Sequence, residues 1–267
     1  MIGMRSPAVA GQFYPLDTED LKLQLDELFK GVARGELPAL GAVVPHAGYV
    51  YSGAVAAEVY ARLPIRETYV ILGPNHHGLG APVALSRDSW RTPLGIVETD
   101  LVMADALAGT IIDQEESAHL QEHSIEVQLP FLQKRFTGFN ILAIVMGLQD
   151  EETAVEVGEA IGKAAHDLKR KCTFIASSDF THYEPQELAK KVDDNLIEAI
   201  LRMDVPELYS RVYRYEATAC GYGPIAATIT AARALGATSG KLLRYATSGD
   251  VTGDYSQVVG YGAIAFT

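Results

Sequence analysis

The sequence lacks several features that decide a protein's class at once. It has only two cysteines, Cys172 and Cys220, in 267 residues, too few for the disulfide framework of a small secreted domain. It has no run of about 18 apolar residues of the kind that spans a bilayer, and no apolar segment behind a basic start at its beginning. We therefore expect a cytoplasmic protein that does not enter a membrane.

Positive charge is also scarce. There are 22 lysines and arginines against 34 aspartates and glutamates, which gives a formal net charge of −12. A surface of this sign repels polyanions, so nucleic acid is not an expected partner. The motifs G-x-G-x-x-G, G-x-x-x-x-G-K-[ST] and G-x-S-x-G are absent, so no sequence signal supports a bound nucleotide or a serine nucleophile of the hydrolase type.

The chain does contain apolar runs that alternate with amphipathic segments. Hydrophobic residues make up 48% of it, enough for a large core. The runs predict strands over 41–44, 82–86, 139–146, 241–248 and 258–266, and strands that lead into loops within 68–78 and 172–183. The periodic segments predict helices from 17 and over 54–63, 101–109, 151–168, 187–201 and 225–235. This alternation predicts an α/β fold: a single domain over residues 1–267 with a mainly parallel or mixed sheet flanked by helices.

Histidines follow three of the predicted strands. His46 comes after GAVV, His76 and His77 come after YVILGPN, and His182 comes after TFIASSDFT. In open α/β sheets ligands bind outside the carboxyl ends of the strands, so these loops are expected to converge on one crevice. Each loop also has a plain structural interpretation, since PHAG and GPNHHG are ordinary turn sequences, and Asp179, three residues before His182, is spaced to cap a helix. Their joint occurrence favours a site.

Cys220 precedes a predicted helix, in TACGYGP. The positive end of a helix dipole favours a thiolate, the form that binds metals or attacks carbon. A small residue in a glycine-rich turn is the structural alternative. Cys172 begins a strand and is expected in the core.

The segment EESAHLQEHSIEVQLPFLQ carries further polar residues. If it is helical, His119 shares a face with His123, and Glu122 shares a face with Glu126, until Pro130 ends or kinks the helix. The two-histidine metal motif H-E-x-x-H is absent. We expect Glu122 and His123 to support the site or line its pocket.

Six ordered motifs resemble one known family. They are RSPAVAGQFYP (5–15), PHAGYVYSG (45–53), ILGPNHHG (71–78), EHSIEVQLPFL (122–132), SSDFTHY (177–183) and CGYGP (220–224). Their order is that of the MEMO family, whose prokaryotic members are called AmmeMemoRadiSam system protein B. The resemblance covers nearly the whole chain.

The resemblance implies a fold like that of the class III extradiol dioxygenases, with a non-haem metal in a crevice. It implies that His46, His76 and Cys220 line the metal position, and that Asp179 and His182 stand beside it, with His182 as a catalytic acid or base. The dioxygenases use a carboxylate where Cys220 stands here. Because thiolate is a softer ligand, iron, copper and zinc all stay open as the metal, and ring cleavage does not transfer with the fold.

The residues alone support the same arrangement. Two imidazoles and a thiolate leave an open position for water, oxygen or substrate, as catalytic sites require. Tyr49, Tyr51 and Tyr183 lie on the same loops and are expected to wall the pocket, with His77 nearby.

Three functions follow as hypotheses. The first is a metal-dependent oxidoreductase that acts on a small molecule, with His182 moving a proton. The second is a hydrolase or acyl transferase with Cys220 as nucleophile, His182 as base and Asp179 as orienting carboxylate. The third is a crevice without catalysis that binds a peptide or a protein partner within a radical SAM modification system.

Overall fold

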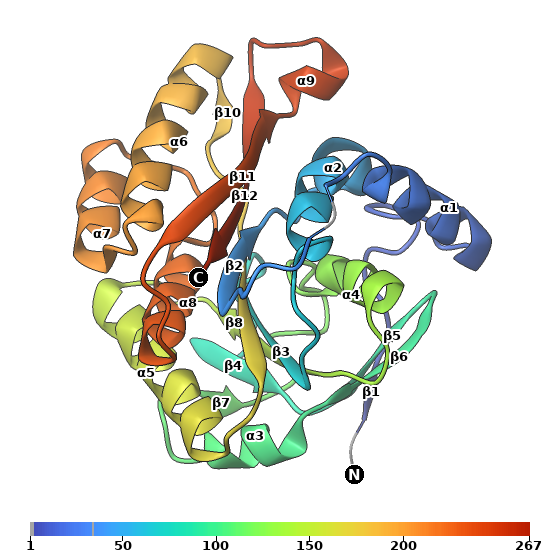
Figure 1. The fold of residues 1–267 in the computed structure, drawn as a ribbon, viewed down its shortest axis with the longest axis vertical. Coiled ribbons are helices and arrows are strands. Elements are labelled where there is room, and N and C mark those ends of the chain that lie inside the picture. Colours follow the sequence, from blue (N-terminus) through green and yellow to red (C-terminus); the bar gives the residue numbers. More distant parts are fainter. Residues whose placement is uncertain (1–2, 34) are drawn as a thin grey trace.

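A central mixed sheet organises the chain, which we describe from a computed structural model covering residues 3–33 and 35–267 (Figure 1). Its middle consists of four parallel strands in the order β8, β3, β9, β2. These are β2 (Gly41–Val44), β3 (Thr68–Pro74), β8 (Asn140–Met146) and β9 (Cys172–Ser177). They are buried almost throughout, as expected for continuous apolar runs covered on both faces. Their carboxyl ends therefore lie at one edge of the sheet.

Antiparallel strands complete the sheet on both sides. Strand β12 pairs antiparallel with β2, β11 pairs with β12, and β4 pairs antiparallel with β8. Their bounds are β4 (Val83–Ser86), β11 (Gly240–Thr247) and β12 (Val258–Phe266). Shorter strands lie at the margins: β1 (Met4–Arg5), β5 (Ser89–Thr92), β6 (Gly95–Thr99), β7 (Asp113–Gln114) and β10 (His182–Glu184). The predicted α/β fold with a mixed sheet is confirmed.

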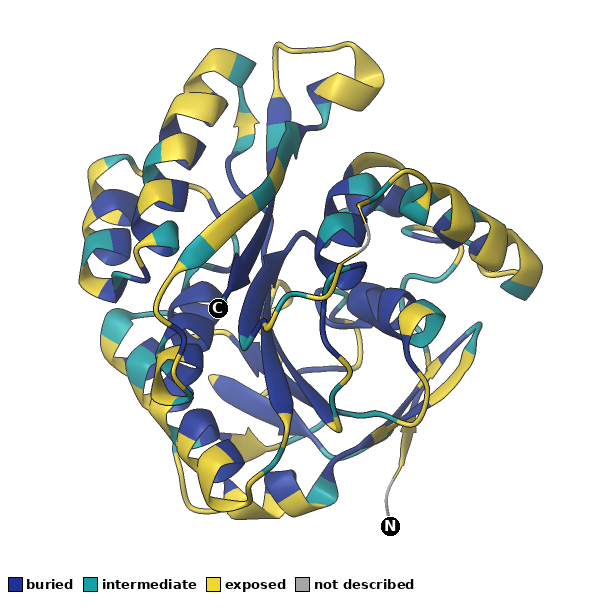
Figure 2. Ribbon diagram, viewed as in Figure 1, coloured by how far each residue is buried: buried dark blue, intermediate teal, exposed yellow. Residues whose placement is uncertain are grey.

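Helices cover both faces of the sheet, and an apolar core lies between the sheet and the helices on each face (Figures 1 and 2). One face carries α3 (Leu101–Ala106), α5 (Glu151–Asp167), α6 (Gln186–Leu201), α7 (Val205–Arg214) and α8 (Tyr222–Ala234). The other carries α1 (Thr18–Phe29), α2 (Tyr49–Tyr60) and α4 (Leu129–Arg135). Helix α9 (Gly249–Thr252) lies beyond the ends of β11 and β12. None of the helices in the described ranges is both long and apolar enough to cross a bilayer.

The N-terminal segment is fixed to the body by a buried ion pair. Arg5 contacts the carboxylate of Glu126 at 2.8 Å, and both side chains are almost fully buried. The same carboxylate accepts hydrogen bonds from the Tyr14 hydroxyl at 2.6 Å and from the Ala8 and Val9 amides. A buried charge must be paired and hydrogen-bonded in this way to be tolerated. The segment is thereby held where Phe13 reaches the pocket described below.

Two local predictions were wrong. Helix α2 begins at Tyr49 with Gly48 as its N-cap, five residues before the predicted start, because the loop after β2 turns at once into helix. The segment with His119 and His123 is not helical: its turns lead into the short 3-10 helix η1 (Glu126–Gln128). Pro130 then lies in the first turn of α4, where a missing N–H costs nothing, so it starts a helix where the sequence predicted an end or kink.

Candidate metal centre and pocket

His46 follows β2 and is held through both its backbone and its ring. Its amide donates to Asp179 Oδ1 at 2.8 Å, and its Nδ1 lies 2.9 Å from Ser177 Oγ. The Ser177 hydroxyl donates to the Ser124 carbonyl at 2.5 Å and accepts from Gln128 Nε2 at 2.8 Å. Since that hydroxyl proton is already used, Nδ1 of His46 must be the donor to Ser177. In this tautomer Nε2 of His46 carries no proton, and its lone pair is available to a metal ion or a hydrogen-bond donor.

His76 follows β3 and has a carboxylate as its partner. Its Nδ1 lies 2.9 Å from Glu122 Oε1, and its amide donates to Glu122 Oε2 at 2.6 Å. Burial raises the pKa of Glu122, but the hydrogen bonds that it accepts, that from the His76 ring above all, outweigh burial and hold the pKa well below the usual range. An ionised Glu122 can only accept, so Nδ1–H of His76 donates the hydrogen bond between them. Nε2 of His76 is then free, and this carboxylate-to-imidazole arrangement is usual behind metal-binding histidines.

A third imidazole, that of His123, joins these two. Its ring centroid lies 4.6 Å from that of His76 and 5.4 Å from that of His46. One ring nitrogen from each of the three residues lies within 4.8 Å of the others, a spacing that suits a bound metal ion. Burial lowers the pKa of His46 well below its usual value and that of His123 to about 4. Both rings are therefore neutral at pH 7 and able to coordinate. The glutamate Glu122 with His77 and His123 forms a second such group.

Cys220 reaches the same place from just before α8. Its Sγ lies 3.2 Å from His46 Nε2 and accepts the Asp179 amide at 3.3 Å. Burial, with the nearby Asp179 charge, raises the pKa of the Cys220 thiol, so the helix dipole does not produce a thiolate here as the sequence suggested. Without a metal this residue is a thiol. Cys172 is buried in the core, as predicted, 3.8 Å from Met103 Sδ.

The structure thus brings the three predicted metal residues to one region, with one addition. His46 and His76 meet directly, and Cys220 contacts His46. The group whose nitrogens converge contains His123 where the resemblance implied Cys220 alone as third ligand. The sequence placed His123 only in the surroundings, because its segment lacks the H-E-x-x-H motif that would have indicated a metal ligand.

His182 is positioned by a β-bulge. The pairing of β10 with β12 shifts between His182 and Glu184, and Tyr183 between them has a φ of 60°. A bulge of this kind re-aims side chains, and here both His182 and Tyr183 line the pocket, which a regular strand would not allow. Nδ1 of His182 lies 2.9 Å from the Thr218 carbonyl, which can only accept, so Nδ1 carries the proton. Nε2 of His182 is left as a base.

Asp179 lies beneath the loop of His46. It is buried, and burial raises its pKa to about 6, against the opposing hydrogen bond from the His46 amide. Its contacts with the His46 amide and with the Cys220 backbone join the two loops that carry these residues. The Cys220–His182–Asp179 triad of the hydrolase hypothesis is not formed: Cys220 contacts His46, and His182 contacts Thr218.

These residues open into a pocket of about 750 Å³ that is lined by residues of α2, β10 and α9 among others. His46, His76, His123, Asp179 and His182 line it; His46 and Asp179 are buried, whereas His76 is exposed. The aromatic side chains Phe13, Tyr51, Tyr183 and Tyr261 line it as well. Tyr49 does not, contrary to the prediction: it is buried in the core, where it donates to the Val127 carbonyl at 2.6 Å, because the early start of α2 turns its ring inward. His77 is exposed in its turn, outside the pocket.

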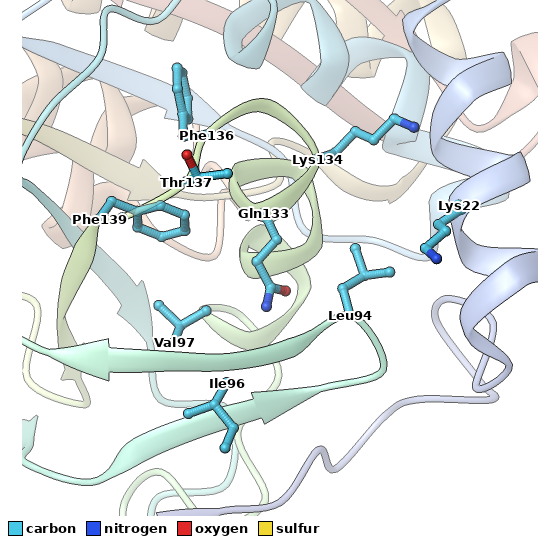
Figure 3. Close-up of a pocket in the computed structure, with 10 residues that line it drawn as sticks. Lys22, Leu94, Ile96, Val97, Gln133, Lys134, Phe136, Thr137 and Phe139 are labelled. Carbon is cyan, nitrogen blue, oxygen red and sulfur yellow. The ribbon is translucent and has the colours of Figure 1, made fainter.

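A second cavity, of about 380 Å³, lies between the β5–β6 hairpin, α1 and the end of α4 (Figure 3). Its walls include Leu94, Ile96, Val97 and Phe139, with Lys22 and Gln133 at its sides. Among the described residues that line it there is no histidine, cysteine or carboxylate. It therefore offers neither metal ligands nor an acid or base, and the histidine pocket is the better candidate for chemistry.

Relatives of known sequence match nearly the whole length of this chain. The chain is 57% identical over 262 residues to a MEMO1 family protein of Methanosarcina barkeri, covering 98% of this chain and 99% of the relative. It is 58% identical to a MEMO1 family protein of Methanococcoides burtonii and 49% identical to one of Archaeoglobus fulgidus, with the same coverage.

A solved structure supports the fold. An uncharacterized protein from Escherichia coli K12 superposes with a TM-score of 0.53 over 84% of this chain and 98% of its own, at 12% identity. The family of Memo-like proteins matches residues 5–265. On this match and on the close archaeal relatives, the chain belongs to the Memo-like protein family.

Proposed function

We propose that this protein is a metal-dependent oxidoreductase that acts on a small molecule in the histidine pocket. The observation that carries the proposal is the convergence of His46, His76 and His123, each with a ring nitrogen within 4.8 Å of the others. A redox metal such as iron or copper, when bound there, would supply electron transfer or a Lewis acid. The donor set suits such a metal, since imidazole binds iron, copper and zinc alike.

The role of each residue follows from its contacts. His46 and His76 present Nε2 toward the site because Ser177 and Glu122 occupy their Nδ1 protons. His123 or Cys220 completes the set, and Cys220 would bring the softer ligand. His182 is the proton acceptor for a substrate in the pocket, because its Nε2 is bare and its Nδ1–H is held by Thr218. The aromatic side chains exclude water from the substrate.

Metal content tests this proposal. The full chain, prepared without oxygen and supplied with ferrous iron, copper or zinc, is expected to hold about one metal ion per chain by elemental analysis. His46→Ala and His76→Ala are expected to hold none. His166→Ala, which changes an exposed histidine on α5, should bind as the parent does. Equal metal content in all four proteins would contradict the proposal.

A second proposal is that the pocket serves a protein partner in a radical SAM modification system. The exposure of two aromatic side chains at the pocket favours it: Tyr51 is 45% and Tyr183 71% exposed. Exposed aromatic side chains at a concave site are typical of binding surfaces. Light scattering on this chain mixed with the radical SAM protein of its system is expected to show a complex that Tyr183→Ala weakens. Full turnover of a small molecule by the chain alone would count against this role.

A further inference from the structure

The charged groups of the pocket are distributed unevenly. Among the described residues that line it, none is a lysine or an arginine. Two carboxylates line it: Asp179, which is buried, and Asp254, which is fully exposed on the loop between α9 and β12. The outer part of the pocket therefore carries negative charge without a balancing cation of its own. A carboxylate or phosphate on a ligand would find no partner there and would be repelled by Asp254.

Asp254 is held in one orientation with an oxygen to spare. Its Oδ1 accepts the Ser256 amide at 2.9 Å and the Ser256 hydroxyl at 2.6 Å. Both hydrogen bonds end on Oδ1, and Oδ2 receives none from the described residues. The loop itself is anchored, because the Gln186 amide donates to the Tyr255 carbonyl and Gly253 takes the left-handed conformation that ends α9. A fixed carboxylate oxygen is thus available to a hydrogen-bond donor in the pocket.

Aromatic rings share the pocket with this carboxylate. Tyr51 comes from α2, Tyr183 from the bulge in β10 and Tyr261 from β12. Faces of aromatic rings attract cations, as a carboxylate does, and both kinds of group line this pocket. A metal at the inner histidines would instead attract an oxygen donor, because it would be the largest positive charge in the site. The two ends of the pocket therefore prefer opposite ends of a ligand.

We propose that the pocket selects a small aromatic amine, with its ammonium group at Asp254 and its oxygen-bearing ring end toward His46, His76 and His123. The inference deepens the proposed function, on which it rests for the metal end, by naming the charge class of the substrate. The volume of about 750 Å³ accommodates a single-ring compound with a short side chain. Anionic aromatic acids of the same size are expected to bind more weakly because Asp254 repels them.

Binding of three matched phenols tests the inference. Tyramine, 4-ethylphenol and 4-hydroxyphenylacetate share a ring and differ in the charge of the side chain. Calorimetric titration of the full chain at low ionic strength, both metal-free and after zinc loading, is expected to give the order tyramine, then 4-ethylphenol, then 4-hydroxyphenylacetate. Each step should be roughly two- to fivefold, as expected for one charge contact with a solvent-exposed carboxylate at low ionic strength.

Two variants separate local from general charge effects. Asp254→Asn keeps the Oδ1 acceptor for Ser256 and is expected to reduce tyramine binding to the level of 4-ethylphenol, with 4-ethylphenol unchanged. Asp167→Asn, an exposed change on α5 that alters the net charge equally, should leave the order intact.

The inference is overturned if the three phenols bind equally, if the acid binds best, if none binds, or if both variants act alike. Elemental analysis of the same zinc-loaded samples distinguishes its failure from that of the proposed function. A zinc-treated sample that holds no zinc counts against the metal centre. The order of the three phenol affinities on the metal-free chain still decides whether the pocket prefers a cationic ligand.

Discussion

His46 and Cys220, 174 residues apart in the sequence, approach to 3.2 Å between Nε2 and Sγ. Since Nδ1 of His46 donates to Ser177, Nε2 can only accept, and the Cys220 thiol is the donor of this contact. Burial raises the pKa of the thiol and lowers that of the imidazole, so both are neutral at pH 7. A metal ion that binds Cys220 would have to displace the thiol proton shared by this pair.

A metal that binds Cys220 is therefore expected to release a proton. The thiol must lose its proton to coordinate, whereas the neutral histidines release none. Cobalt(II) added at pH 7.5 should release about one proton per ion and give a sulfur-to-cobalt charge-transfer band in the near ultraviolet. Cys220→Ala should abolish both signals, and Cys172→Ala, a change in the core, should keep them. Cobalt binding without either signal in the parent would identify His46, His76 and His123 as the complete ligand set.

Glu122 is expected to control metal affinity without touching the metal. It accepts hydrogen bonds from the ring and amide of His76 and from the amides of His123 and Ser124. Glu122→Gln removes the charge and turns an N–H₂ group toward these donors. Metal affinity in competition with a chelator should fall roughly 10- to 100-fold, the usual effect of losing such a partner.

Glu156→Gln, on the exposed side of α5, is the control for loss of one charge. Unchanged affinity in Glu122→Gln would show that the orientation of His76 does not depend on the carboxylate.

Sequence patterns predicted the sheet and its loops because the signals there are local. Continuous apolar runs indicated β2, β3 and β9, and the rule that ligands bind at the carboxyl ends of strands brought His46, His76 and His182 to one region. The family resemblance added Cys220. The position of His123 was not predictable from periodicity, since turns replace the helix that its spacing suggested. The Ser177 and Gln128 contacts that fix the His46 ring join segments 49 residues apart, and no local pattern signals them.

The bulge at Tyr183 is a further feature that no pattern indicated, and it stores backbone strain. A φ of 60° costs a residue with a β-carbon roughly 1–2 kcal/mol, and asparagine tolerates it better than tyrosine. Because the side chain is 71% exposed, little packing is lost on substitution. Tyr183→Asn should raise the free energy of unfolding by up to about 1 kcal/mol in urea titrations. Tyr183→Val should lower it, since branching at the β-carbon worsens the clash, and equal shifts for the two variants would show that the strain is absent.

The buried ring of His119 is expected to make the folded state less stable at acid pH. Its ring is fully buried against Trp90, with centroids 5.8 Å apart, and burial, with the charge of Arg5, lowers its pKa from 6.5 to about 4. The unfolded chain therefore binds a proton near pH 6.5 that the folded chain accepts only near pH 4. Stability from this residue is complete above pH 6.5 and is lost as the pH falls through that window, by up to about 3 kcal/mol.

The variant His119→Leu cannot take up that proton in either state. Its free energy of unfolding should fall less than that of the parent between pH 7.5 and pH 4.5, whatever its value at pH 7.5. Urea titrations at pH 7.5, 6.0 and 4.5 measure the difference, with His166→Leu, a change at an exposed position on α5, as a control. Parallel curves for the parent and His119→Leu would mean that other buried groups, such as Glu122, govern the acid response.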